Sequence, residues 1–505
     1  MSNYRVNHIL IAGGGTAGWM TAAKLNQHFS QTTVKITVIE SSEIGTIGVG
    51  EATIPTLRRF YQSLGMSDLE VIRKTAATVK LGIEFKDWHK PGSSFIHPFG
   101  IFGHEANGIR FHHYWMKLRE LGDNSALEEY SLGIAMARAN KFTFPLENPE
   151  SPLSIFDWAL HFDASLFGKL MRDYALAQGV EHIDAKINHV NIHADNGFIR
   201  SLTLDDDREL AADLFIDCTG FRGLLIGDAL KTDYVDWSQW LLCNRAMAVQ
   251  SELVGEAMAR TVSKAHTAGW QWKIPLQHRQ GNGHVYCSEF VSDEQAKETL
   301  LQHIDGKVLH SPRKFHFTPG RRSRAWNKNC IAIGLAAGFL EPLESTSIAL
   351  IETGIEKICS SFLRPFFDQE VVDQFNQRTA AEWERIRDFI IVHYKLNQRN
   401  DSEFWHYCRN ISMPDSLQQK ITAYHERGDL LHYPYEIFHP DSWLAIYSGF
   451  GFYPQNYHKN VERLNPKYLQ QSLALMRQSI TEAVAGFPSL NDFMLQNQAQ
   501  YSVGE

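Results

Sequence analysis

The sequence of 505 residues predicts an α/β fold whose first part contains a parallel sheet and whose last part is largely helical. Three observations favour this class. An apolar segment runs directly into a glycine-rich turn at 13–18, and a second segment alternates apolar and polar residues up to an acid. Long amphipathic segments fill the chain after about residue 365. The first two observations describe a strand–helix–strand unit, from which Rossmann-like sheets are built.

The composition excludes several classes of protein. Hydrophobic residues make up 44% and charged residues 21%, so the chain can bury a large core. Lys and Arg total 49 against 57 Asp and Glu, which leaves no basic field for nucleic acid or anionic lipid. The six cysteines are not spaced as metal ligands, and no long apolar segment is present. We expect a cytoplasmic protein with no metal, no nucleic-acid partner and no membrane contact.

The elements follow in order along the chain. Residues 8–12 predict a buried strand, 19–29 a helix, and 34–40 a second strand. Residues 79–86 alternate cleanly, which predicts one continuous strand with Lys80 on the polar face, directed away from the apolar layer.

The middle of the chain is less regular. Residues 91–154 show no strong period, which predicts long loops with short elements around a ligand cavity. The alternation of strands and helices returns at 155–230, with a strand at 214–216. A further strand at 330–333 leads to a helix that begins near Ser345.

The glycine-rich turn has the pattern Gly13-x-Gly15-x-x-Gly18 and is followed about twenty residues later by Glu40. Such glycines permit a tight turn and close approach of a pyrophosphate at a helix N-terminus, and the acid can hold a ribose hydroxyl. A purely structural glycine turn is the less favoured interpretation, because a strand precedes this turn and a helix follows it. No second fingerprint occurs, so we expect one bound dinucleotide.

The same turn, extended to Trp19, resembles the start of flavin-dependent halogenases of the tryptophan halogenase type. Further segments of the chain resemble that family's motifs, and the resemblance spans most of residues 5 to 410. These segments are GVGEATIPT at 48–56, KLGIEF at 80–85, HFDA at 161–164, WQWKIP at 270–275, GNG at 281–283 and EPLEST at 341–346.

The resemblance implies a Rossmann-like FAD-binding fold of the flavoprotein monooxygenase type with an interleaved substrate domain. It also implies how the chain is divided. We expect a discontinuous FAD-binding domain at 1–90, 155–230 and 325–365, a substrate-binding region at 91–154 and 231–324, and a mostly helical part at 366–505 that completes the substrate pocket.

The resemblance assigns the catalytic roles to Lys80 and Glu344. In the family, reduced FAD and dioxygen oxidise halide to hypohalous acid. Lys80 then positions or captures the halogenating species, while Glu344 polarises it or stabilises the cationic ring and helps to remove its proton. From the residues alone, a solvated lysine and a glutamate that favours a helix N-terminus are the simpler interpretations.

The resemblance also implies the cofactor, its co-substrates and a partner. FAD, as FADH2, would be supplied by a separate NAD(P)H-dependent flavin reductase, with O2 and chloride or bromide as co-substrates. The halide would lie against the backbone N–H groups of Thr346 and Ser347. The residues implied to hold FAD are Gly13, Gly14, Gly15, Thr16, Ala17, Gly18, Glu40, Gly50, Glu51, Ala52, Ile187, Leu335 and Ile348.

The expected substrate is an electron-rich arene of the indole type. His97, Phe99 and Trp443 are the candidate substrate contacts. Trp270 and Trp272, at i and i+2 of a strand, form either a core contact or a wall beside the flavin. The segment 438–443 departs from the family's grip on the amino-acid end of tryptophan, which argues against free tryptophan. Regiochemistry, the preferred halide and a homodimer remain open.

Two other functions remain as alternatives. An aromatic monooxygenase on the same fold would reduce its own flavin. Such hydroxylases usually carry Gly-Asp-Ala-Ala after the last flavin-domain strand, whereas this chain has Gly-Leu-Ala-Ala at 334–337. A flavin-binding protein without turnover would have no reason to hold both Lys80 and Glu344 within these motifs.

Overall fold

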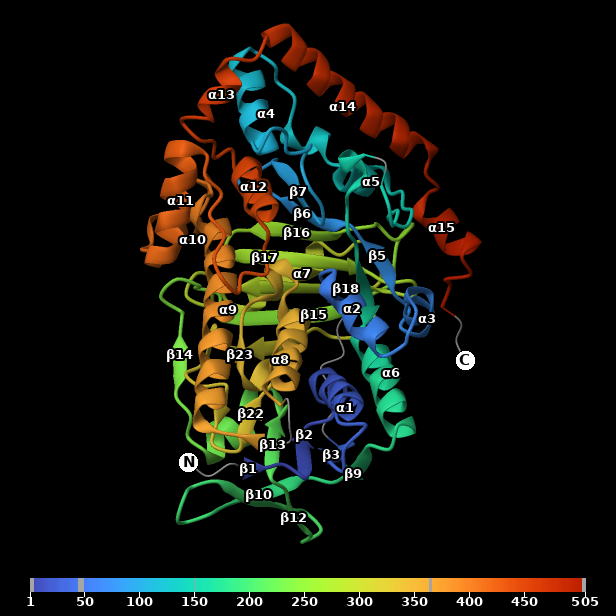
Figure 1. Ribbon diagram of the computed structural model, residues 1–505, viewed down its shortest axis with the longest axis vertical. Helices are drawn as coiled ribbons and strands as arrows, with labels where there is room; N and C mark the ends of the chain where they lie inside the picture. Colours follow the sequence, from blue (N-terminus) through green and yellow to red (C-terminus); the bar gives the residue numbers. More distant parts are fainter. Residues whose placement is uncertain (1–3, 44–49, 150, 363–365, 502–505) are drawn as a thin grey trace.

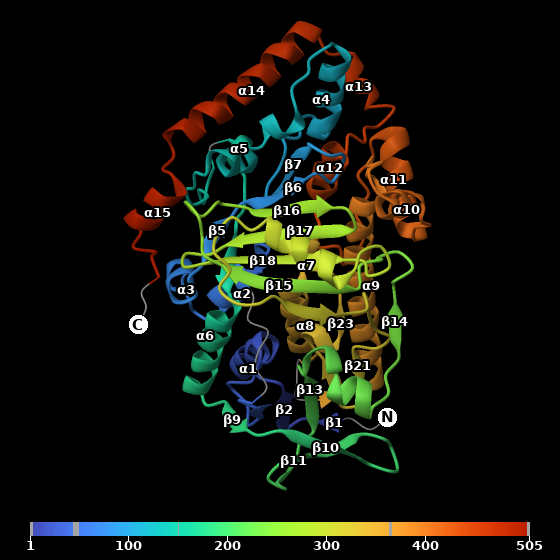
Figure 2. The same cartoon turned by 180° about the vertical axis from the view of Figure 1, so that it is seen from behind.

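A computed structural model describes residues 4–43, 50–149, 151–362 and 366–501. A six-stranded and a seven-stranded sheet lie one above the other along the long axis of the molecule (Figure 1, and from behind in Figure 2). The helices of the C-terminal part run beside both sheets and over the end farthest from the six-stranded one. This arrangement confirms the predicted α/β class with a largely helical C-terminal part.

The six-stranded sheet contains the predicted nucleotide-binding strands. All its pairings are parallel except the one at the β21 edge. Ile9, Leu10 and Ile11 at its centre are completely buried, as expected of an apolar run in a parallel sheet covered on both faces. The strands, in spatial order, are β21 (Trp326–Asn327), β22 (Cys330–Ala332), β13 (Leu214–Asp217), β2 (His8–Ala12), β3 (Lys35–Glu40) and β9 (Glu181–Asp184).

Two helices of this part, α6 (Ala164–Ala177) and α8 (Ser347–Ser361), pack on α1 (Thr16–His28). Helix α1 starts three residues earlier than predicted, because the glycine turn ends at Gly15. Helix α8 begins at Ser347, close to the predicted start. Two short helices, α2 (Thr56–Ser63) and α3 (Asp68–Lys74), follow β3 and precede the first strand of the seven-stranded sheet along the chain.

The seven-stranded sheet is mainly antiparallel, and α7 (Asp293–Gln302) packs on it. Its only parallel pairing joins β16 to β6. The strands, in spatial order, are β19 (Arg313–His316), β15 (Arg245–Ser251), β18 (Gln280–Tyr286), β17 (Gly269–Pro275), β16 (Thr261–His266), β6 (Gly82–Lys86) and β7 (Ser94–Pro98).

The single strand predicted at 79–86 is wrong. The chain changes sheets at Leu81, whose N–H donates to Ala259 O at 2.8 Å and whose carbonyl accepts from Phe99 N at 3.0 Å. Strand β5 (Thr78–Lys80), before this break, joins β8 (Ala159–Asp163) and β4 (Gly50–Ala52) in a three-stranded sheet. Lys80 is completely buried rather than directed to a polar face.

The prediction of long loops at 91–154 is also wrong in part. This segment holds α4 (Phe111–Glu120) and α5 (Leu132–Ala139) besides β7. The C-terminal helices were expected. They are α9 (Gln369–Lys395), α10 (Glu403–Asn410), α11 (Asp415–Arg427), α12 (Pro440–Gly449), α13 (Lys459–Glu462), α14 (Pro466–Gly486) and α15 (Leu490–Gln496).

The predicted division into domains stays a prediction. Across the described residues, no helix is long and apolar enough to cross a lipid bilayer.

Smaller sheets complete the structure. The remaining strands are β1 (Tyr4–Arg5) with β24 (Phe366–Phe367), β10 (Ile187–Ile192) with β11 (Ile199–Leu204) and β12 (Glu209–Ala211), and β14 (Tyr234–Asp236) with β20 (Gly320–Arg322) and β23 (Gly338–Phe339).

Four buried histidines affect how stability depends on pH. Burial, the largest cause in each case, lowers the pKa of His112 and of His266 to about 3. It lowers the pKa of His113 and of His284 to about 4. Neighbouring imidazoles add to the effect, such as His284 beside His266. The folded protein therefore keeps these rings neutral at pH values where the unfolded chain binds protons.

We expect the contribution of these four rings to the free energy of unfolding to be full above about pH 6.5 and to fall steadily towards pH 4. Each ring contributes a loss on the order of 2–3 kcal/mol at pH 4, because the unfolded state is almost fully protonated there and the folded state at most about half. Thermal unfolding followed by circular dichroism at pH 8, 7, 6 and 5 measures this. The variant His284→Gln should take up about one proton fewer on unfolding at pH 5. Equal proton uptake by His284→Gln and the wild type contradicts the prediction.

Candidate functional site

The glycine turn between β2 and α1 has the geometry that a pyrophosphate needs. Gly13 has a φ of +106°, and a Cβ there would lie 2.3 Å from the carbonyl oxygen of Cys218. A Cβ on Gly14 would lie 1.7 Å from a Glu40 carboxylate oxygen. At Gly15 the space around a Cβ is open. The backbone is thus packed tightly behind the turn and is open in front of it, at the N-terminus of α1.

Glu40 lies at the end of β3, beside this turn. Its carboxylate accepts from Trp19 Nε1 at 3.4 Å and lies 3.0 Å from His182 Nε2 and 3.7 Å from an Arg172 guanidinium nitrogen. The group is partly exposed, so it can accept further hydrogen bonds. The turn and this acid together fit the pyrophosphate and ribose of a dinucleotide.

The other predicted cofactor residues lie on several different elements. Gly50, Glu51 and Ala52 form β4, and burial raises the pKa of Glu51 to about 7. Gly48 and Val49 of the same motif lie outside the described residues. Positions for the rest are Thr16 and Ala17 at the start of α1, Gly18 within it, Ile187 at the start of β10, Leu335 in the turn after β22, and Ile348 in the first turn of α8.

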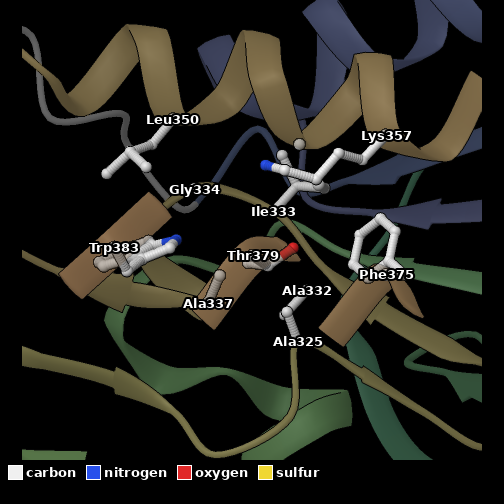
Figure 3. A pocket seen from close by; sticks show the side chains of 11 residues that line it. Ala325, Ala332, Ile333, Gly334, Ala337, Leu350, Lys357, Phe375, Thr379 and Trp383 are labelled. Carbon is white, nitrogen blue, oxygen red and sulfur yellow. The ribbon is translucent and has the colours of Figure 1, made fainter. Parts of the chain in front are cut away.

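A small cavity lies behind the turn that follows β22, where it meets α8 and α9 (Figure 3). Its lining includes Gly334 from the turn, Lys357 from α8, and Thr379 and Trp383 from α9. The volume of about 10 Å³ suits about one water molecule. Because the buried Thr379 hydroxyl has no hydrogen-bond partner among the described residues, a water there would satisfy it. This cavity is too small for a flavin or an arene.

Lys80 has no exposed surface and faces the start of α8. Its ammonium donates to Thr53 O and to Ser345 Oγ, both at 2.8 Å, and lies 5.0 Å from the centre of the Phe99 ring. Burial lowers the pKa of Lys80 to about 7, although the charge of Glu344 acts in the opposite direction. The functional interpretation of Lys80 requires a buried ammonium that can donate; Lys80 is buried, and a pKa of about 7 lets it hold or release this proton near neutral pH.

Ser345 lies between a short 3-10 turn, Pro342–Glu344, and the start of α8. Its φ of 60° is left-handed, at the point where the 3-10 turn ends and α8 is about to begin. Thr346 is the N-cap residue, and Ser347 is the first residue of the helix. The Thr346 hydroxyl is buried and lacks a hydrogen-bond partner among the described residues. The predicted halide donors therefore lie directly beside the predicted catalytic glutamate.

Glu344 is held by two histidines. Its Oε2 lies 2.8 Å from His97 Nδ1, and its Oε1 lies 2.8 Å from His393 Nε2. All three side chains are at most 3% exposed. Burial alone would raise the pKa of Glu344, but the two imidazoles lower it to about 2. His97, a predicted substrate contact, thus contacts the predicted catalytic glutamate. No motif marks His393, which lies in the apolar stretch of α9.

The other two predicted substrate contacts, Phe99 and Trp443, lie in different surroundings. Phe99 is half-buried near Lys80, whereas Trp443 is 2% exposed and donates from Nε1 to Glu436 at 2.6 Å. Phe389 lies between Trp443 and His97, with ring centres 4.9 Å and 5.7 Å away. Phe438 stacks on Phe389 at 3.8 Å. These rings form one aromatic cluster, and His97 joins the cluster to Glu344.

Trp270 and Trp272 project from the same side of β17, with ring centres 5.9 Å apart, and both are buried. A Cβ on Gly283 of the neighbouring strand β18 would lie 2.0 Å from the Trp272 ring. The glycine of the GNG segment therefore makes room for the second indole. Within the described parts of the chain, no group of three or more His, Cys, Asp or Glu side chains could hold a metal ion.

Comparison with known proteins identifies the family. The model of the tryptophan halogenase family matches residues 8–466. Tryptophan 6-halogenase ThaL from Streptomyces albogriseolus is 35% identical over 492 residues, which cover 90% of this chain and 91% of ThaL. Tryptophan 7-halogenase RebH from Lentzea aerocolonigenes is 33% identical, over 83% of this chain and 82% of RebH.

Among solved structures, the flavin-dependent halogenase BrvH from Brevundimonas sp. BAL3 is 54% identical with a TM-score of 0.95, over 98% of this chain and 99% of BrvH. The flavin-dependent halogenase Xcc4156 from Xanthomonas campestris is 38% identical with a TM-score of 0.94, over 98% of each chain. The family predicted from the motifs is confirmed: the chain is an enzyme of the tryptophan halogenase family.

Proposed function

We propose that the chain is a FADH2-dependent halogenase that uses O2 and chloride or bromide and halogenates an electron-rich arene of the indole type. One observation carries the proposal. Two buried groups of opposite charge, Lys80 and Glu344, lie on either side of the Ser345 turn, where Lys80 bonds the Ser345 hydroxyl. Neither group is placed there by ordinary packing, because burying a charge is costly.

FAD would be held by the backbone of the glycine turn at 13–18, with Glu40 at the ribose. When bound and reduced, it supplies with O2 the oxidising power that converts halide to hypohalous acid. The backbone N–H groups of Thr346 and Ser347 would bind the halide at the start of α8. The buried indoles of Trp270 and Trp272 would separate the arene from the flavin.

Lys80 would act on the hypohalous acid and Glu344 on the arene. As the carbon–halogen bond forms, the halogen–oxygen bond breaks, and the departing hydroxide takes a proton from the Lys80 ammonium to give water. The ring is then cationic, and the nearby carboxylate of Glu344 stabilises it. Glu344 accepts the proton from the halogenated carbon, which restores the aromatic ring.

The aromatic cluster supports an apolar arene rather than free tryptophan. Phe438 lies in the segment that departs from the family's grip on the amino-acid end, and it stacks on Phe389 next to His97. An aromatic ring at this point offers no ion pair to an ammonium or a carboxylate. A separate NAD(P)H-dependent flavin reductase would supply FADH2 in the cytoplasm, because the chain carries one dinucleotide fingerprint.

Incubation with FAD, a flavin reductase, NADH, O2, bromide and a panel of indoles tests the function directly. We expect singly halogenated indoles, seen by mass spectrometry through the bromine isotope pattern. Omission of the reductase should abolish the product, since NADH alone would not reduce the bound flavin. Hydroxylated products instead of halogenated ones would favour the monooxygenase and overturn the proposal.

The variant Lys80→Met should lower halogenation by at least about a hundredfold, because it keeps the side-chain length and removes the proton donor. Flavin oxidation and the release of hypohalous acid, followed with a chromogenic trap, should continue at the wild-type rate. Loss of FAD binding in this variant would instead mean that Lys80 is structural.

The variant Gly15→Val should fold, because Gly15 has an extended backbone with φ −75° and open space at its Cβ. The added side chain would occupy the pyrophosphate position, so we expect FAD affinity to fall at least tenfold in a flavin-fluorescence titration. The control Gly486→Val adds the same side chain in open space at the end of α14 and should leave affinity unchanged. Equal affinity in Gly15→Val would place the cofactor elsewhere.

A further inference from the structure

The protonation of His393 follows from its hydrogen bonds. Its Nδ1 lies 2.7 Å from the carbonyl oxygen of Phe389 in the preceding turn of α9. A carbonyl oxygen only accepts, so Nδ1 carries a hydrogen. Its Nε2 lies 2.8 Å from Glu344 Oε1. An ionised carboxylate also only accepts, so the proton in this second bond belongs either to His393, as an imidazolium, or to a neutral Glu344.

Two other buried glutamates show how burial changes the pKa of a carboxyl group that has no cationic partner. Glu341 precedes Glu344 by three residues, and burial raises its pKa to about 7. Glu352 lies in α8, and burial raises its pKa to about 8. Glu344 is equally buried, yet its pKa is about 2. The difference is the pair of imidazoles, because neither Glu341 nor Glu352 has a cationic partner.

The titratable groups that face Glu344 come from three described elements: Lys80 from β5, His97 from β7 and His393 from α9. His97 needs only its neutral form with a hydrogen on Nδ1 to donate to the carboxylate. His393 is enclosed by the rings of Phe85 and Phe450, with centres at 5.0 Å and 6.2 Å. These rings cannot take its proton.

We infer that His393 is a positioning residue that carries two ring protons and holds the buried Glu344 carboxylate ionised and oriented between two imidazoles. The ring is fixed at one end by the Phe389 carbonyl, so its second N–H can point only at Glu344. The catalytic consequence rests on the proposed function: an ionised Glu344 is ready to stabilise a cationic ring at neutral pH.

Nuclear magnetic resonance of the full chain labelled with ¹⁵N-histidine tests this without any turnover. We expect one imidazole with both nitrogens protonated throughout pH 6.5 to 8.5. Its signal should be absent in His393→Gln and present in the control His284→Gln, whose Nδ1 contacts a backbone carbonyl at 3.0 Å but no carboxylate. In Glu344→Gln, His393 should become a neutral ring. A neutral or titrating His393 in the wild type would overturn the inference.

The pH profile of halogenation gives a second measurement. In His393→Gln the acid limb should move up by at least about one pH unit, with a tenfold loss of rate per unit below it, because one of the two imidazoles that oppose the burial of Glu344 is then missing. Release of hypohalous acid should keep the wild-type profile. A uniform loss of rate at every pH would overturn the inference and make His393 merely structural. Absence of product from the wild type would refute the proposed function, and the resonance data would still decide this inference.

Discussion

The hydrogen bond from the Lys80 ammonium to the Ser345 hydroxyl joins segments 265 residues apart, and the arrangement of the site depends on it. It links the end of a short strand in one sheet to the turn that starts α8. It is possible only because the chain leaves the three-stranded sheet at Leu81 and enters the seven-stranded sheet at Gly82. This change of sheets turns Lys80 into the interior and sets it beside Glu344.

A lysine and a glutamate buried together would normally neutralise each other by direct contact. Here each has other partners: the Thr53 carbonyl and the Ser345 hydroxyl for Lys80, and two imidazoles for Glu344. The two charges are therefore kept close but separately solvated by protein groups. Such preorganised groups need no reorganisation when charge develops during a reaction.

The sequence sufficed for the parts of the fold that depend on local pattern. Residues 9–12 and 214–216 are wholly apolar because both faces of these strands are covered, and such segments are easily found. The break at Leu81 could not be found, because the alternation continues across it and only distant pairing partners change. Lys80 and Glu344 came from motifs shared with a family. His393 is one polar residue in an apolar helical stripe, which looks like a packed core histidine until its partner 49 positions away is known.

The left-handed conformation of Ser345 carries a cost of roughly 1–2 kcal/mol, which a glycine there would largely relieve. Glycine, however, has no hydroxyl to accept from Lys80. Serine at this position therefore lowers the free energy of unfolding relative to glycine but supplies the hydroxyl that organises the site. Substitutions chosen only to raise the melting temperature would select against the group that orients the lysine.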